Sequence, residues 1–261
     1  MTYKELVSRN WGFLTPEIQR KIKRTRILLA GCGLGSNIAL LAARTGFTKF
    51  IIADGDKVEV NNLNRQAFSL CQTGRNKAAV TAELIKEVNP EAQIEVFPQF
   101  ITEKNAEPLI TKVDFVINMV DPSPVIFELN RIANSQGKIA ISPLNVGFGG
   151  VVLVFSPCST TLEEIVGDRT SPEGFFLKLL EKVSAFLPGY LERDFLGVKD
   201  EIEQKGQPFP QLGIASFANA SLVVTVIIRA LMGLPLKLAP QPITIDTWSA
   251  VGYEGGFQHA T

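Results

Sequence analysis

Four polar side chains in the first half of the chain are suited to hold a polyphosphate. Asn62, Arg65 and Lys77 carry hydrogen-bond donors, and Asp121 carries a carboxylate. Arginine can form paired hydrogen bonds with phosphate oxygens, and lysine binds them as a point charge. Mg²⁺ prefers one or two carboxylates together with phosphate oxygens and water. These residues therefore predict a site for a nucleoside triphosphate, with Mg²⁺ at Asp121.

A glycine turn precedes these residues and could hold the phosphates. Gly31, Gly33 and Gly35 lie directly after the apolar run Arg26–Ala30. Backbone amides in such a turn, at the start of a helix, can approach and bind an anion. Asp54 follows the turn by about 20 residues, where a carboxylate can accept hydrogen bonds from ribose hydroxyls. The turn and Asp54 alone would equally suit a NAD-linked oxidoreductase, so the basic residues are what favour ATP.

The elements that must position these residues alternate between strands and helices. Apolar runs typical of strands cover residues 26–30, 50–53, 94–97, 113–119, 138–142, 150–155 and 243–245, and helical patterns cover 16–24, 36–46, 77–88, 125–135 and 215–232. Strand, glycine turn, helix and strand in this order form a right-handed βαβ unit with parallel strands. We expect a Rossmann-like, doubly wound, mostly parallel α/β sheet with helices on both faces. Its ligands would bind at the carboxyl ends of the strands.

The chain is expected to form a single domain over residues 1–261, in which residues 1–30 are an N-terminal lead and the first strand. Residues 158–210 mix charges, aromatic residues, prolines and glycines, which predicts short helices and loops of a variable crossover region inserted into that domain. The most apolar stretch, residues 217–234, approaches the length of a membrane span but contains Asn219 and Arg229. A buried core helix is the better interpretation.

Composition excludes several classes of partner and site. Lys plus Arg equal Asp plus Glu at 26 each, so overall charge favours neither nucleic acid nor a membrane surface. Cys32, Cys71 and Cys158 are isolated from one another, without the paired spacing of a zinc site or a disulfide framework. The N-terminus lacks the layout of a signal peptide. These features predict a cytoplasmic protein.

Further motifs join the residues above. The segment Asn62–Gln66 has the sequence NLNRQ, Asp54 is paired with Asp56, and Arg9 precedes a Gly-Phe pair. With the glycine turn, Lys77 and Asp121, these motifs run in the order of the ThiF/MoeB/HesA family, which the chain resembles over most of its length. This family comprises the bacterial relatives of ubiquitin-activating enzymes. The turn GCGLG has one glycine fewer than the GxGGxG common in the family.

The resemblance implies an ATP-dependent adenylyltransferase. Its substrate would be the C-terminal glycine of a small ubiquitin-like or sulfur-carrier protein, activated as an acyl adenylate with release of pyrophosphate. Arg65, Lys77, Asp121 and Arg9 would be catalytic, and Arg9 would reach in from the second subunit of a homodimer. Nucleotide-binding roles would fall on Gly31, Gly33, Gly35, Asp54, Asp56, Asn62, Arg65, Gln66 and Lys77.

Plainer interpretations stay open beside this one. Arg65, Lys77 and Asp56 could each be ordinary surface charges, and Asn62 could serve a turn. Cys158 could accept the acyl group as a thioester, but nothing near it in sequence would activate the thiol, so we expect no such role. A catalytically inactive module that binds a nucleotide or a partner is a further alternative.

Overall fold

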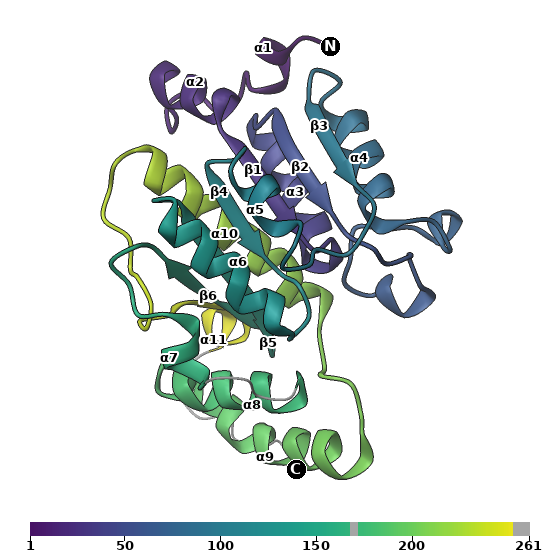
Figure 1. Ribbon diagram of the computed structural model, residues 1–261, viewed down its shortest axis with the longest axis vertical. Coiled ribbons are helices and arrows are strands. Elements are labelled where there is room, and N and C mark those ends of the chain that lie inside the picture. The colour runs from purple at the N-terminus through teal and green to yellow at the C-terminus, as the bar shows by residue number, and fades with distance from the viewer. Residues whose placement is uncertain (168–171, 253–261) are drawn as a thin grey trace.

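The computed structural model describes residues 1–167 and 172–252, which contain one seven-stranded sheet between helices (Figure 1). The strands are β1 Arg26–Ala30, β2 Lys49–Ala53, β3 Gln93–Phe97, β4 Phe115–Asn118, β5 Ile139–Val146, β6 Gly149–Phe155 and β7 Ile243–Asp246. Their order across the sheet is β3-β2-β1-β4-β5-β6-β7. The first five strands are parallel, while β6 and β7 are antiparallel to their neighbours. The predicted mostly parallel, doubly wound sheet is confirmed.

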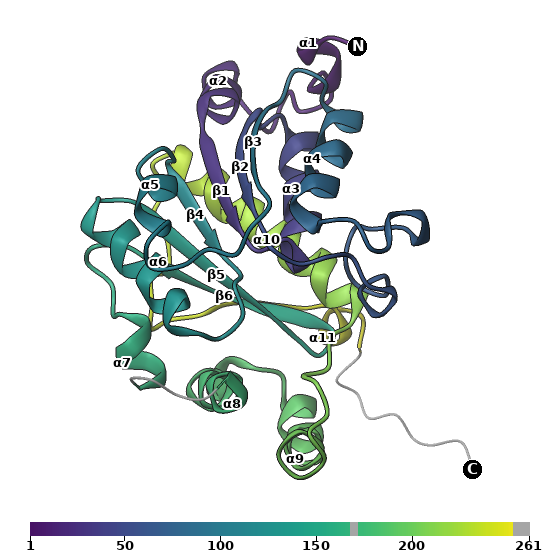
Figure 2. The same cartoon turned by 45° about the vertical axis from the view of Figure 1, so that its right-hand side comes forward.

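Helices cover both faces of this sheet (Figure 2). They are α1 Tyr3–Leu6, α2 Pro16–Arg24, α3 Gly33–Thr45, α4 Lys77–Val88, α5 Ala106–Ile110, α6 Pro124–Ser135, α7 Leu162–Val166, α8 Pro172–Val183, α9 Gly189–Lys205, α10 Gly213–Leu231 and α11 Thr247–Val251. Short 3₁₀ segments are η1 Val60–Asn62, η2 Leu70–Gln72 and η3 Ser184–Phe186. One core lies between the sheet and α2, α3, α4 and α10, and the other between the sheet and α5 to α8.

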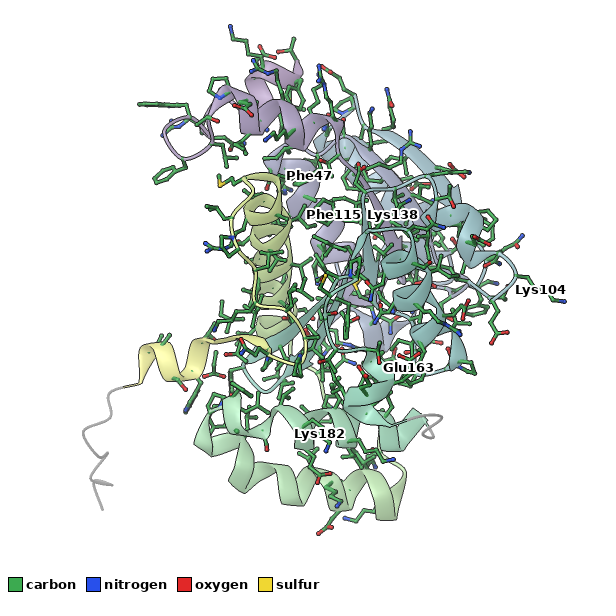
Figure 3. The ribbon with its side chains drawn as sticks, turned by 60° about the vertical axis from the view of Figure 1, so that its left-hand side comes forward. Phe47, Lys104, Phe115, Lys138, Glu163 and Lys182 are labelled. Atoms are coloured by element: carbon green, nitrogen blue, oxygen red, sulfur yellow. The ribbon has the colours of Figure 1, made fainter. Side chains whose placement is uncertain are left out.

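The strand sequences are continuously apolar because both faces of the sheet are covered. In β1, Ile27 and Leu29 pack into one core and Leu28 and Ala30 into the other. Side chains of a strand alternate between the two faces, so an apolar run of this kind fills both cores at once. Figure 3 shows Phe47 in the interior, and this side chain is fully buried.

The long helix α10 is the predicted core helix. It is long and apolar enough to cross a membrane, but half of its apolar window is buried inside the protein. It packs against α3 and β6, with Val223 and Ile227 buried in the first core. Packing against the sheet therefore accounts for its apolar composition.

The described part of residues 158–210 contains helices α7, α8 and α9, and α9 is longer than the short helices that the sequence predicts there. The helix α9 has 17 residues and ends at Lys205, and the following Gly206 adopts a left-handed conformation with φ +64°. The insertion lies beyond the carboxyl ends of the parallel strands (Figure 1). It is therefore on the side of the sheet where ligands of such folds bind.

Candidate active site

A cavity of about 610 Å³ opens at the carboxyl ends of the parallel strands. It lies where the strand order reverses between β1 and β4, which is the usual ligand position in an open α/β sheet. Nine predicted site residues line it: Gly31, Gly33, Asp54, Asp56, Asn62, Arg65, Gln66, Lys77 and Asp121. The fold thus brings together residues that are far apart in sequence. Gly31 and Asp121, for example, are separated by 90 positions.

The glycine turn is shaped by the end of the neighbouring strand. Gly31 has φ +100°, and a Cβ there would lie 2.6 Å from the carbonyl oxygen of Met119. Helix α3 begins at Gly33, three residues earlier than the sequence predicts, so its first amides belong to the turn. Gly35 does not line the cavity; a Cβ there would lie 2.8 Å from Cε of Met119. Close packing against Met119 explains this last glycine without a ligand.

Asp54 holds the turn and the following loop together. Its Oδ2 accepts a hydrogen bond from the Cys32 amide at 2.6 Å, and its Oδ1 accepts one from the Asp56 amide at 2.7 Å. Burial raises the pKa of Asp54, although these two amides and the nearby Lys77 oppose the shift. The carboxylate lies at the end of β2 and lines the cavity, where it can still accept hydrogen bonds from a ribose.

Lys77 is placed by the cap of helix α4. Asn76 Oδ1 accepts a hydrogen bond from the Ala79 amide at 3.0 Å, and Asn76 Nδ2 donates to the Asp54 carbonyl at 2.9 Å. Lys77 Nζ lies 3.1 Å from Asp56 Oδ2. The Lys77 side chain is 10% exposed, whereas that of Asp56 is 45% exposed. Lys77 is therefore a largely buried cation at the cavity wall and not an ordinary surface charge.

Arg65 lines the same cavity from the segment after η1. Its Nη1 donates hydrogen bonds to the Asn61 carbonyl at 2.7 Å and to Asn64 Oδ1 at 2.8 Å. Burial lowers the pKa of Arg65, but arginine remains charged at any physiological pH. The guanidinium is thus held by its own segment through Nη1, and among the described residues its other donors have no protein acceptor and could bind an anion.

Asn62 and Gln66 differ in how their polar atoms are used. Asn62 Oδ1 accepts from the Glu59 amide at 3.1 Å and its Nδ2 donates to Asn61 Oδ1 at 2.8 Å, so Asn62 serves the turn as well as lining the cavity. Gln66 Oε1 is buried without a hydrogen-bond partner among the described residues. A buried unpaired acceptor is costly, and a ligand donor could satisfy it.

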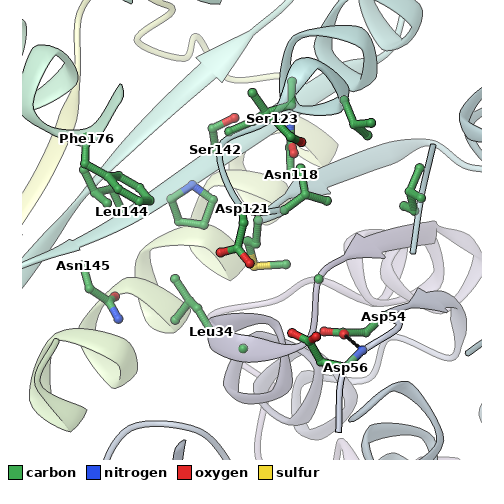
Figure 4. A pocket seen from close by; sticks show the side chains of 18 of the residues that line it. Leu34, Asp54, Asp56, Asn118, Asp121, Ser123, Ser142, Leu144, Asn145 and Phe176 are labelled. Carbon is green, nitrogen blue, oxygen red and sulfur yellow. Dashed lines mark hydrogen bonds between the residues drawn. The ribbon is translucent and has the colours of Figure 1, made fainter. Parts of the chain in front are cut away.

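Asp121 lies at the mouth of the cavity just after β4. In Figure 4, its carboxylate is between Asp54 and Asp56 on one side and Leu144 and Phe176 on the other. The described residues contain no group of three potential metal ligands. A single exposed carboxylate nevertheless fits Mg²⁺, which takes most of its ligands from phosphates and water.

Strand β5 and the helical insertion supply cavity residues that the sequence analysis missed. Strand β5 extends to Val146, four residues beyond its predicted end, and contributes Ser142, Pro143, Leu144 and Asn145. Helix α8 contributes Phe175, Phe176 and Leu179. The β5 residues were detectable as the end of a parallel strand, but no local pattern shows that α8 packs beside the cavity at the carboxyl ends of the strands.

Hydrogen bonds through Gln211 and Asn145 connect the Arg65 segment to this end of the cavity, with Asn145 Nδ2 3.4 Å from Gln211 Oε1. Asn64 Nδ2 donates to the Gln211 carbonyl at 3.1 Å. Asn145 Nδ2 donates to Ser216 Oγ at 2.7 Å, and Asn145 Oδ1 accepts from Asn219 Nδ2 at 2.9 Å. The bonds of Asn145 thus join β5 to the start of α10.

The sequence pattern of the ThiF family matches residues 7–254. The chain belongs to the ThiF family. It is 31% identical over 140 residues to a probable molybdopterin-synthase adenylyltransferase of Gracilaria tenuistipitata var. liui, covering 53% of this chain and 39% of that protein. It is 29% identical over 141 residues to the sulfur carrier protein ThiS adenylyltransferase of Escherichia coli K12, covering 53% and 56%. The aligned part thus spans about half or less of these relatives' lengths.

Solved structures share the fold of this ThiF-family chain. E. coli MccB, in a crystal structure with ATP, has a TM-score of 0.64 and 18% identity, covering 88% of this chain and 63% of that one. E. coli TcdA, a tRNA N6-threonylcarbamoyladenosine dehydratase, has a TM-score of 0.63 and 20% identity, covering 88% and 95%. At these identities the likeness concerns architecture alone.

Two residues considered from the family resemblance lie outside this chain's own cavity. Arg9 is exposed, and its neighbour Asn10 donates a hydrogen bond to the Thr45 carbonyl at the far end of α3 from the glycine turn. A helix of 13 residues is about 20 Å long, so Arg9 is far from its own site. Cys158 is exposed after β6 and does not line the cavity. His259, the lone histidine, is outside the described residues.

Proposed function

We propose that this ThiF-family chain is an ATP-dependent adenylyltransferase that activates a carboxylate and releases pyrophosphate. The observation that carries the proposal is a single cavity that contains the glycine turn, Asp54, Arg65, Lys77 and Asp121. Two relatives named as adenylyltransferases support it. A NAD-linked oxidoreductase would use the turn and Asp54 but would leave the two cations and Asp121 without a role.

The reaction joins two anions, the substrate carboxylate and ATP. The cations Arg65 and Lys77 would reduce the repulsion between them. An oxygen of the substrate carboxylate forms a bond to the α-phosphorus of ATP. The bond from that phosphorus to the oxygen bridging to the β-phosphate breaks, and pyrophosphate leaves with the electron pair. Arg65 and Lys77 are fixed before the reaction, so they can stabilise the growing negative charge without reorganising. Mg²⁺ held by Asp121 and phosphate oxygens would neutralise charge on the leaving pyrophosphate.

The order of the cavity residues along the sheet suggests how ATP lies. Phe100 and Ile101 follow β3 and line the cavity beside Asp54 at the end of β2. The adenine would lie at this side and the ribose at Asp54. The phosphates would then extend past the amides of the glycine turn toward Arg65 and Lys77.

Pyrophosphate exchange tests this function, because labelled pyrophosphate enters ATP only if adenylation is reversible on the enzyme. We expect exchange that requires both Mg²⁺ and a carboxylate substrate. Lys77→Ala should lower the exchange rate by about 100-fold or more, as removal of a preorganised charge-stabilising group does. Lys104→Ala, at an exposed lysine outside the cavity, is the matched control and should leave the rate unchanged. An equal loss in both variants would contradict the assigned role of Lys77.

We further propose a homodimer in which Arg9 of the second subunit completes the cavity. The position of Arg9 outside its own cavity supports this arrangement. The partner substrate would be a small ubiquitin-like or sulfur-carrier protein, as the relatives' names suggest. Its C-terminal tail would enter on the side of Asp121 that faces β5.

A further inference from the structure

The cavity continues well past the proposed nucleotide site. The parallel strands lie in the order β3-β2-β1-β4-β5, and the nucleotide-binding residues belong to the ends of β1 and β2. Beyond Asp121, at the end of β4, the cavity extends to β5 and to helix α8. We refer to this part, lined by the residues of β5 and α8 together with Leu153 and Leu162, as the acyl half.

The acyl half is lined mostly by apolar side chains and is backed by packed aromatic rings. Phe175 and Leu179 are buried, at 3% and 6% exposure. The Phe176 ring is stacked on Phe209 with 5.3 Å between centroids and meets Phe175 edge-on at 5.6 Å. Figure 4 shows Phe176 and Leu144 at the end of the cavity opposite Asp54. A ligand that is polar or has no side chain would bury little of this apolar surface, so it would gain little hydrophobic binding free energy.

The wall contains Asn145, whose side chain is hydrogen-bonded to Ser216 and Asn219, and two further polar atoms lie on the side of Asp121. Ser142 Oγ and Asn118 Oδ1 are buried without a hydrogen-bond partner among the described residues, and Asn118 is 2% exposed. Both residues line the cavity. Each oxygen can accept a hydrogen bond, so the N–H of a peptide bond next to the substrate carboxylate would satisfy one of them.

We infer that the acyl half binds a peptide C-terminus with an aliphatic or aromatic side chain within its last two residues. This inference rests on the proposed adenylation and narrows its substrate. A tail ending in two glycines would present its carboxylate but leave the apolar wall uncovered. Burying one such side chain strengthens binding by about tenfold or more. The amide of the same tail would donate to Ser142 or Asn118.

Steady-state pyrophosphate exchange with three otherwise identical hexapeptides, ending in Gly-Gly, Phe-Gly and Gly-Phe, tests the inference. At least one Phe-containing peptide should have a KM about tenfold below that of the Gly-Gly peptide. Equal or lower KM for the Gly-Gly peptide would overturn the inference and leave the proposed adenylation intact. No exchange with either Phe-containing peptide, in protein whose ATP binding is shown by titration, would also overturn it. Failure to bind ATP at all would instead overturn the proposed function.

Substitutions in the apolar wall of the acyl half distinguish loss of peptide side-chain recognition from general structural damage. Phe176→Ala should raise KM about tenfold for the preferred Phe peptide while KM for ATP and for the Gly-Gly peptide changes less than about twofold. Phe186→Ala, at a phenylalanine that is 52% exposed and does not line the cavity, should change none of these constants. Leu144→Asn provides a second test if Phe176→Ala does not fold. Equal effects on all three peptides would contradict a side-chain compartment.

Discussion

At the residue scale, Asp54 has the most demanding position in the cavity, because it must stay charged while buried. The unfolded carboxyl has a pKa of about 3.9, and burial raises the pKa in the folded protein. The folded state therefore favours the protonated form of Asp54. Its contribution to the free energy of unfolding grows as pH falls through the raised pKa, and this contribution is smallest at pH values above that pKa. Ligand binding should show the opposite trend, since ribose hydroxyls need an ionised acceptor.

ATP titrations across a pH series test whether ionised Asp54 is needed for ATP binding. The affinity should fall as pH drops through the pKa of Asp54, because protonation removes an acceptor for the ribose. Asp54→Asn should bind ATP more weakly at neutral pH and lose that part of the pH dependence. A variant with the same pH profile as the wild type would show that another group controls nucleotide binding.

Substitution of Gly31 tests whether the backbone conformation of the turn requires glycine at this position. Gly31→Ala combines a left-handed φ with a Cβ 2.6 Å from the Met119 carbonyl oxygen. Gly74→Ala is the matched control: its φ is +84°, but no atom of the described residues lies within 4 Å of the added carbon. The left-handed conformation should cost each variant about 1–2 kcal/mol of unfolding free energy in urea denaturation. Gly31→Ala should cost more, and equal losses would contradict the close approach of β4.

At the element scale, helix α4 carries Lys77 and depends on its cap. Asn76→Ala should lower the free energy of unfolding by about 1 kcal/mol, because the side-chain cap of the Ala79 amide is lost. Ser123→Ala is the control, since Ser123 is at the N-cap of α6 but makes no side-chain cap bond. ATP affinity should fall in Asn76→Ala as well, because Asn76 also donates to the Asp54 carbonyl. Unchanged ATP affinity would indicate that the loop keeps its shape without Asn76.

The elements differ in how far the sequence could predict them. Helix α2 has its predicted bounds because Thr15 caps it and Pro16 begins it, and both signals are local. The pairing of β5 with β6 was not predicted, since it depends on the turn at Gly147, which has φ +54°. The nine cavity residues found from motifs are at strand ends or in the segments that follow, where topology alone brings them together. Phe176 could not be found, because the packing of α8 over the cavity depends on distant contacts.

At the scale of the whole molecule, the proposed homodimer predicts that two inactive variants restore each other. Arg9→Ala and Lys77→Ala would each be inactive alone. In co-expressed mixed dimers, one site would combine an intact Lys77 with Arg9 of the other subunit. About a quarter of wild-type pyrophosphate exchange should return when subunits mix freely. No recovery, with mixed dimers shown by mass measurement, would place Arg9 in its own subunit's site or outside catalysis.

The central claim is that the cavity joins a carboxylate to the α-phosphorus of ATP, and following an isotope through the reaction tests it most directly. A peptide substrate with heavy oxygen in its carboxylate is incubated with ATP, Mg²⁺ and the protein, and the acyl product is captured with hydroxylamine. Capture breaks the bond between the acyl carbon and its oxygen, so AMP should carry one heavy oxygen. Label in inorganic phosphate, or AMP without label, would contradict the proposed adenylation.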